Sequence, residues 1–157
     1  MFNQPLGYFI SFRTYGTWLH GDERGSVDRR HNQFGTPLVS PSNARQGFES
    51  QSLRHEPVEL TPDGRRVVLD SIREVAHHKA WTLHAADART NHVHVVIAAP
   101  LFPERVMNIL KTWATRRLRE AGLARQDQRI WSRHGSTIYL FRPENMAEKI
   151  RYVNECQ

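Results

Sequence analysis

Two histidines separated by one residue are the first candidates for chemistry in this sequence. The run Asn91-His92-Val93-His94-Val95-Val96-Ile97 favours a strand, and side chains at i and i+2 of a strand point to the same face. His92 and His94 would then converge on one ion, while Val93 and Val95 face the other way. Two imidazole nitrogens with an added oxygen ligand suit Mg²⁺, Mn²⁺ or Zn²⁺. An arbitrary His-x-His pair is more often part of a half-buried sheet face, so the spacing alone leaves both interpretations open.

The second candidate is Tyr152, on the last predicted helix. It follows Ile150 by two positions, about 200° around a helix, so it lies off the apolar stripe of Met146, Ile150 and Val153. A phenol attacks phosphate only where the phosphate is polarised and aligned, and a bound metal ion supplies both effects. A half-exposed packing tyrosine is the alternative. With the histidine pair, the tyrosine would complete a site that holds an ion and a nucleophile.

Basic residues are the third feature. The 157-residue chain has a formal net charge of +6 and a pI of about 10.1, which favours a polyanionic partner, most often nucleic acid. The second predicted helix has basic residues beside its apolar stripe, and the segment 21–60 mixes arginines with Phe34 and Phe48. Such mixtures suit phosphate contacts and base stacking, although charges on a helix often form only a solvated face. The candidate DNA contacts are Arg13, Lys111, Arg116, Arg117, Arg119, Arg29 and Arg30.

Length and composition narrow the class of protein. The length corresponds to one domain, spanning residues 1–157, which can bury a core without disulfides. The single cysteine, Cys156, cannot form an internal bridge, and this fits a reducing compartment. No stretch is long and apolar enough to span a membrane, and the N-terminus lacks the pattern of a signal peptide. We therefore expect a cytoplasmic protein without a membrane partner.

The elements that must position these residues follow an alternating order. A helix is expected to begin at Thr61 and Pro62, and two later helices are expected to begin at Pro103 and Pro143. Segment 21–60 holds too little apolar surface for its own core and is expected to be a long loop. The order βαββαβα predicts an α+β, ferredoxin-like sandwich, with an antiparallel sheet and helices on one face. The predicted strands are 7–15, 82–86, 92–98 and a fourth that covers 130–131 and 136–141, with a bulge or bend at His134-Gly135. The second helix is predicted over about 103–120.

The run from Asn91 to Ile97 resembles the Asn-His-Val-His-aliphatic motif of the HUH single-tyrosine transposases. The likeness is closest to the REP-associated tyrosine transposases and related insertion-sequence transposases. The opening segment from Tyr8 to Leu19 also looks like the first strand of that family. Trp131 and Tyr152 fall where the family has an aromatic residue and its nucleophile. The likeness covers the chain apart from residues 21–60.

This resemblance implies a Mg²⁺- or Mn²⁺-dependent transposase that cuts and rejoins single-stranded, hairpin-bearing DNA. Tyr152 would form a 5′-phosphotyrosine bond and release a 3′-hydroxyl, and His92 and His94 would bind the metal. The family often takes its third ligand from a Gln four residues after the tyrosine. Cys156 occupies that position here and Gln157 follows it. Gln157, or Glu155 in its place, is therefore the predicted third ligand.

Other functions remain open from the sequence. One is a domesticated protein that binds hairpin DNA without cutting it, and the displaced Gln is the feature that favours it. Another is an RNA-binding ferredoxin-like domain, which would need no metal and form no covalent adduct. A zinc hydrolase is disfavoured because the sequence lacks a His-Glu-x-x-His motif. A homodimer is a further possibility. The transposase hypothesis predicts preference for single-stranded or hairpin DNA over blunt duplex, and binding that weakens steeply with salt.

Overall fold

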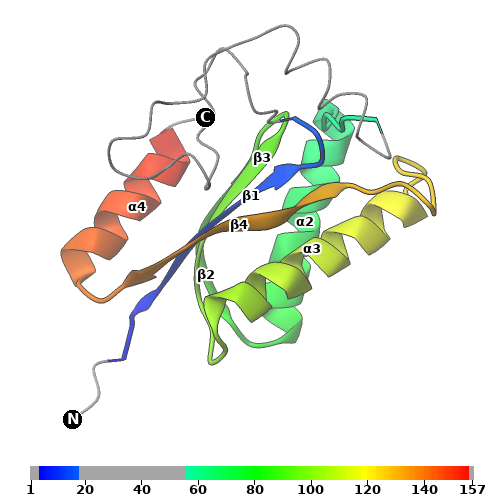
Figure 1. The fold of residues 1–157 in the computed structure, drawn as a ribbon. Helices are drawn as coiled ribbons and strands as arrows, with labels where there is room; N and C mark the ends of the chain where they lie inside the picture. Colours follow the sequence, from blue (N-terminus) through cyan, green and yellow to red (C-terminus); the bar gives the residue numbers. More distant parts are fainter. Residues whose placement is uncertain (1–3, 18–55, 156–157) are drawn as a thin grey trace, which may run out of the picture.

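The computed structural model describes residues 4–17 and 56–155, which form a four-stranded sheet with three helices (Figure 1). Proline begins all three helices, as its fixed φ favours the first turn. Thr61 caps the first of them by accepting a hydrogen bond from the Gly64 amide at 3.0 Å. The elements are β1 (Gly7–Thr14), α2 (Pro62–His78), β2 (Thr82–Ala88), β3 (His92–Ala98), α3 (Pro103–Glu120), β4 (Trp131–Leu140) and α4 (Pro143–Glu155).

The strands lie in the order β2-β3-β1-β4, and every neighbouring pair is antiparallel. This order follows from two βαβ-type halves joined by the β2–β3 hairpin, and it confirms the predicted α+β, ferredoxin-like class. β1 and β3 are the two central strands, and β4 forms one edge of the sheet. The histidine-bearing strand therefore lies in the middle of the sheet, where it has a partner on each side.

One face of the sheet is covered by α2 and α3 (Figure 1). Ile10 and Phe12 of β1 and Val93, Val95 and Ile97 of β3 point into this core and are almost completely buried. The apolar stripes of both helices pack against them, as the period-2 pattern of the strands and the 3.6-residue period of the helices require. The end of the long N-terminal segment also joins this core through Val58 and Leu60.

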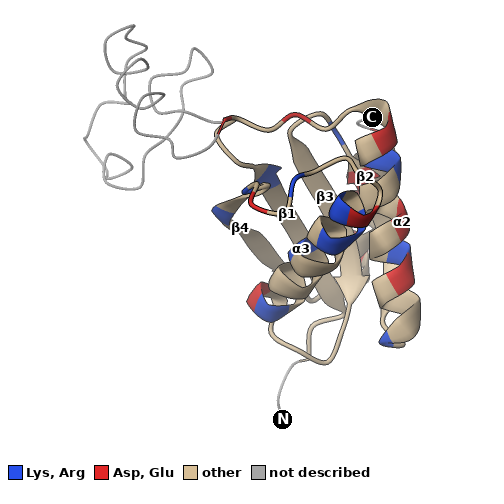
Figure 2. Cartoon of the chain, turned by 90° about the vertical axis from the view of Figure 1, so that its right-hand side faces the viewer, with Lys and Arg blue, Asp and Glu red and all other residues tan. Residues whose placement is uncertain are grey.

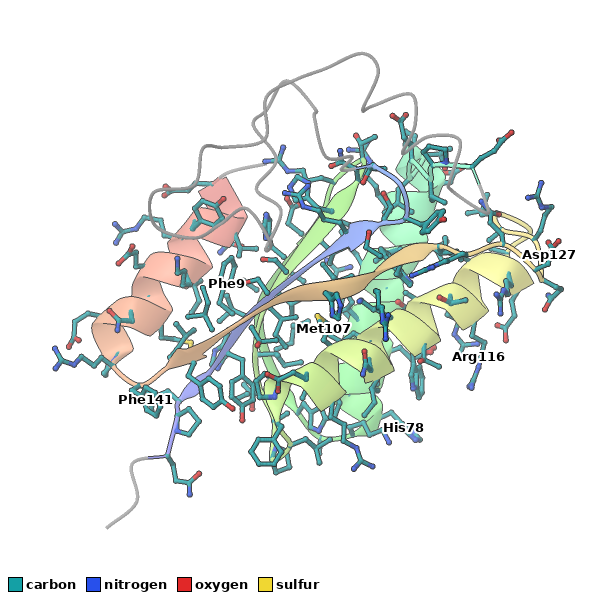
Figure 3. All side chains as sticks on the ribbon, in the orientation of Figure 1. Phe9, His78, Met107, Arg116, Asp127 and Phe141 are labelled. Carbon is teal, nitrogen blue, oxygen red and sulfur yellow. The ribbon has the colours of Figure 1, made fainter. Side chains whose placement is uncertain are left out.

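The other face carries α4, and this corrects the expectation that the helices lie on one face. Met146 and Val153 of α4 pack with Phe9, Val96 and Leu140 from the strands. In Figure 3, Phe9 lies on the α4 side of the sheet and Met107 on the side of α3. The βαββαβ order accounts for α2 and α3, but α4 follows the last strand and is free to cross to the second face. The helix α4 therefore covers part of this second face of the sheet.

Two strands differ in detail from their predicted bounds. β2 extends to Ala88, two residues beyond the predicted end, because Asp87 and Ala88 pair with His94 and Val93. β4 runs from Trp131 to Leu140 without a break, and the predicted bend appears as a register shift against β1. Within the described residues, no helix combines the length and apolar composition needed to cross a bilayer.

Candidate functional site

His92 and His94 lie on the same face of β3, beside α4 rather than in the main core. Their ring centroids are 4.8 Å apart. The Nδ1 atom of His92 lies 2.8 Å from the side-chain oxygen of Asn91, and Nδ1 of His94 lies 2.7 Å from the hydroxyl oxygen of Ser11. A hydrogen bond donated from Nδ1 selects the tautomer whose Nε2 carries the lone pair, as a metal-ligating histidine requires.

The strand register explains why Ser11 meets His94. β1 and β3 pair so that Ser11 lies opposite His94 and Arg13 lies opposite His92, and directly paired residues point to the same face. Burial lowers the pKa of His94 from 6.5 to about 4, and His92 adds to this effect by charge repulsion. His94 is therefore a neutral imidazole near pH 7, the form that binds a metal ion.

Tyr152 lies beside this pair, on α4. Its ring centroid is 5.7 Å from that of His94 and 5.9 Å from that of Phe9, edge to face. Phe9 in turn stacks on His94 with centroids 5.6 Å apart and planes at 19°. The tyrosine side chain is 44% exposed, off the buried stripe of α4. The packing thus brings the two sequence candidates together and leaves the tyrosine accessible.

A cavity of about 370 Å³ opens beside the histidines. Ser11 and Arg13 from β1 and Ser132 and His134 from β4 line it with the histidine pair. His134 lies two residues before Ser136, which pairs with Ser11, so strand alternation places both side chains of β4 on the face of the histidines. The cavity is lined by hydroxyl, guanidinium and imidazole groups, which suit a phosphate.

The family model described as "Transposase IS200 like" matches residues 54–139, which is more than half of the chain. This chain belongs to the IS200-like transposase family. The matched region contains the histidine strand, α3 and most of β4. The family predicted from the histidine motif is confirmed, and membership favours DNA rather than RNA as the nucleic acid.

The comparisons with solved structures and with curated proteins give less information than the family model. A similar solved structure is that of a REP-associated tyrosine transposase bound to a REP hairpin. The alignment has 10% identity and a TM-score of 0.49, and it covers 98% of this chain and 67% of that one. No curated protein matches the chain.

Two residues that contact the candidate site were not among the predicted site residues. Phe9 was assigned only to a strand, although its ring joins His94 and Tyr152. The ammonium of Lys149 lies 4.9 Å from the Phe9 ring centroid and 5.7 Å from that of Tyr152. The spacing of Lys149, three residues before Tyr152 on a helix, was a usable signal for this contact. The position of Phe9 depends on where α4 docks, for which the sequence holds no signal.

Asp87 is a third missed residue, because its segment was assigned to the hairpin loop. It lies on β2 opposite His94, is 8% exposed, and accepts a hydrogen bond from the Arg89 guanidinium at 2.9 Å. Its negative charge raises the pKa of His94, against the larger lowering effects of burial and His92. Asp87 therefore sets part of the electrostatic environment of the histidine pair.

The predicted third metal ligand is not resolved by the described residues. Glu155 is the last residue of α4 and is exposed. Within residues 4–17 and 56–155, no three His, Cys, Asp or Glu side chains are grouped so that they could hold an ion. Glu155 thus does not complete such a group with His92 and His94. Gln157 lies outside the described residues, and its role stays a prediction.

The predicted DNA contacts separate into four sets. Arg29 and Arg30 lie outside the described residues, and Arg13 lines the histidine cavity. Arg117 is engaged by Glu74 and Glu120, with N–O distances of 2.6 Å to each. Lys111, Arg116 and Arg119 line a different and larger hollow between α3 and β4.

Proposed function

We propose that this transposase cuts and rejoins single-stranded, hairpin-bearing DNA through a covalent bond between Tyr152 and a 5′ phosphate. A divalent ion, Mg²⁺ or Mn²⁺, would be bound by His92 and His94. The observation that carries the proposal is the packing of the Tyr152 ring against His94 on an accessible part of the sheet, with centroids 5.7 Å apart. A surface tyrosine with only a packing role has no need of a neighbouring histidine pair.

The donor set fits such an ion. Two histidines that project from one strand supply two nitrogens, and their Nδ1 contacts to Asn91 and Ser11 fix the ring orientations. A small protein ligand set leaves coordination positions for phosphate oxygens and water. A bound ion would polarise the phosphorus–oxygen bonds and align the phosphate for attack. The oxygen ligand would come from Gln157, or from Glu155 if the end of α4 rearranges.

The reaction that these residues support is an exchange of phosphodiester bonds. The phenolic oxygen of Tyr152 forms a bond to phosphorus, and the bond from phosphorus to the 3′-oxygen breaks. The phenol loses its proton and the departing 3′-oxygen gains one, which leaves a free 3′-hydroxyl. When the 3′-hydroxyl of another strand attacks the phosphotyrosine, the same steps run in reverse and rejoin the DNA. One ester is exchanged for another, so no external energy source is needed.

Lys149 and Arg13 would assist this exchange by their charge. The ammonium of Lys149 lies over the Tyr152 ring, 5.7 Å from its centroid, where its positive charge would attract the phosphate. Arg13 lies opposite His92 in the cavity, where a guanidinium suits the non-bridging oxygens of a phosphate.

The test is a pair of tyrosine variants with matched exposure. Wild type, Tyr152→Phe and Tyr139→Phe would be incubated with Mn²⁺ and end-labelled single-stranded DNA that contains a hairpin. Tyr139 is the control because it is 40% exposed, close to the 44% of Tyr152, but packs against Tyr8 instead of the histidines. A denaturing protein gel would show a covalent protein–DNA band for wild type and Tyr139→Phe and none for Tyr152→Phe.

Two results would contradict the proposal. A covalent band from Tyr152→Phe would assign the nucleophile to another residue. If wild type bound the hairpins but never formed the band, the chain would be a hairpin-binding protein that has lost cleavage. The second outcome is the alternative function, favoured by Cys156 at the position where the family often has its Gln.

A further inference from the structure

A hollow larger than the histidine cavity lies on the other side of β4 from it. It has a volume of about 750 Å³ and runs between α3 and the edge strand β4. We call it the α3–β4 groove, defined by Lys111, Thr112, Arg116 and Arg119 on α3 and by Ser132 and Arg133 on β4. Figure 2 shows basic segments on both elements. No part of the proposed reaction uses this groove.

Hydrogen bonds hold the floor of the groove in place. The ammonium of Lys111 donates to the Ser132 carbonyl at 2.9 Å. The indole N–H of Trp131 donates to the Thr115 hydroxyl at 3.0 Å. Burial, with a smaller effect from Arg129, lowers the pKa of Lys111. Lys111 therefore anchors β4 to α3, which assigns it a structural role beneath the groove and leaves the ligand contacts to the residues above it.

The charge of the groove is unbalanced. Within the described residues, Arg116 and Arg133 have no carboxylate within ion-pair distance. Arg116 is exposed on α3 (Figure 3). The acidic residue among those that line the groove, Glu120, is paired with Arg117 at 2.6 Å. Two exposed guanidinium groups thus line a hollow whose acidic lining residue is already engaged by another arginine, an arrangement that suits phosphate oxygens.

The groove and the histidine cavity share a wall. Ser132 lines both of them, Arg133 lines the groove, and His134 lines the cavity. Consecutive side chains of β4 therefore point to opposite sides of the sheet at this edge. β4 has no strand beyond it within the described residues, so a flexible chain can pass from the cavity over this edge into the groove.

We propose that the α3–β4 groove binds the phosphodiester backbone of the single strand that leaves the histidine cavity across β4. The proposal rests on the proposed function, in that the cavity is where the strand is cut. Charge complementarity favours a polyanion. The sharp turn over one β-strand favours a single strand, because duplex DNA is stiff over about 150 base pairs and cannot fold around such an edge. Arg133 and Arg116 would contact successive phosphates.

Binding of defined probes to two double variants tests this path. The groove variant is Arg116→Gln with Arg133→Gln. The control is Arg66→Gln with Arg73→Gln, which removes the same charge from exposed positions on α2. The probes are a fluorescent DNA hairpin with a single-stranded tail of roughly 12 nucleotides, within the usual range for single-strand sites, the same hairpin without a tail, and the hairpin with its tail made duplex. Affinity is measured in EDTA, so that cleavage does not interfere.

For the tailed hairpin, we expect the groove variant to bind on the order of tenfold more weakly than the control at moderate salt. The slope of log affinity against log salt should fall by roughly 1.4, since each lost phosphate contact on a single strand is worth about 0.7. The hairpin without a tail should bind equally to both variants. Unfolding temperatures of the two variants should agree, because the substituted side chains are exposed.

Equal affinities of the two variants for the tailed hairpin would overturn the proposal. The proposal would also fail if the groove variant lost as much affinity for the hairpin without a tail, because the groove would then contact the stem. An equal loss of affinity for the hairpin with a duplex tail would overturn it as well. Covalent adduct formation by wild type is scored separately. If the groove variant bound the tailed hairpin more weakly but wild type formed no adduct, the cleavage function would be refuted and the single-strand binding in the groove retained. If wild type formed the adduct but the groove variant bound as tightly as the control, only the binding in the groove would be refuted.

Discussion

The two faces of the sheet are built from the same strands and have opposite composition. On the face covered by α2 and α3, Ile10, Phe12, Val93 and Ile97 are almost completely buried. On the face beside α4, the alternate positions of β1 and β3 carry Phe9, Ser11, Arg13, His92 and His94. Only the part near Phe9 and Val96 is closed by apolar side chains of α4. The rest of this face is polar and opens into the histidine cavity.

This difference shows how a small sheet separates folding from reactivity. Because successive residues of a strand point to opposite faces, each site residue on β3 is flanked by core residues that fix its backbone. His94, for example, lies between Val93 and Val95, both fully buried. Substitutions on the covered face should therefore act on stability, and those on the open face should act on reaction.

The largest effect should come from the open face. Replacing His92 and His94 with alanine should reduce metal-dependent formation of the protein–DNA band below detection, because both nitrogen ligands are lost. Binding of the tailed hairpin in EDTA should survive, since the α3–β4 groove proposed to hold its single-stranded tail is untouched. The matched control is His77→Ala with His78→Ala, two exposed histidines on α2. Retained cleavage in the His92 and His94 double variant would break the assignment of the open face to chemistry.

The next effect belongs to the covered face. Ile97→Ala should lower the free energy of unfolding by about 2–5 kcal/mol, because it leaves a cavity at a completely buried position. Ile150→Ala removes the same atoms from α4, where the side chain is only half-buried, and should cost less. Urea unfolding with an unchanged m-value measures both. If Ile150→Ala were the more destabilising, α4 would be as much a part of the folding core as α2 and α3.

The covered face was largely predictable from the sequence. The start of α2 at Thr61-Pro62 and the bounds of α3 and β3 are confirmed, because each has a local signal in capping residues, proline or periodicity. The class of fold followed from the order of these elements. The side of the sheet that α4 covers was predicted wrongly, because the stripe of Met146, Ile150 and Val153 shows that the helix has a buried face without showing which surface buries it.

The open face was predictable only for residues with a spacing signal. His92 and His94 share a face because they are two residues apart, and Tyr152 stands out because it is off its helix stripe. Ser11 reaches His94 only through the register of β1 against β3, which links residues 83 positions apart. His134 reaches the cavity because the register of β4 against β1 places its face of β4 beside that of Ser11. Contacts of this kind are set by tertiary packing.

The smallest effect expected is on how the stability of the fold depends on pH. It also distinguishes the open face, which carries His94, from the covered face. The pKa of His94 is about 4 in the folded chain, against 6.5 for an unperturbed histidine. Between these values the unfolded chain binds a proton that folded His94 does not, so stability rises with pH in this window and falls as the pH drops from 6.5 toward 4.

His94→Gln removes this titration. In EDTA, the unfolding temperature of wild type should therefore decrease more between pH 7 and pH 5 than that of His94→Gln, over a range in which ordinary carboxyl groups remain largely ionised. Ile97→Ala, which lowers stability from the covered face, should keep the wild-type pH dependence at a lower temperature. Parallel curves for wild type and His94→Gln would mean that His94 is as well solvated when folded as when unfolded, and the open face would then be more accessible to water than its packing against Phe9 and Tyr152 indicates.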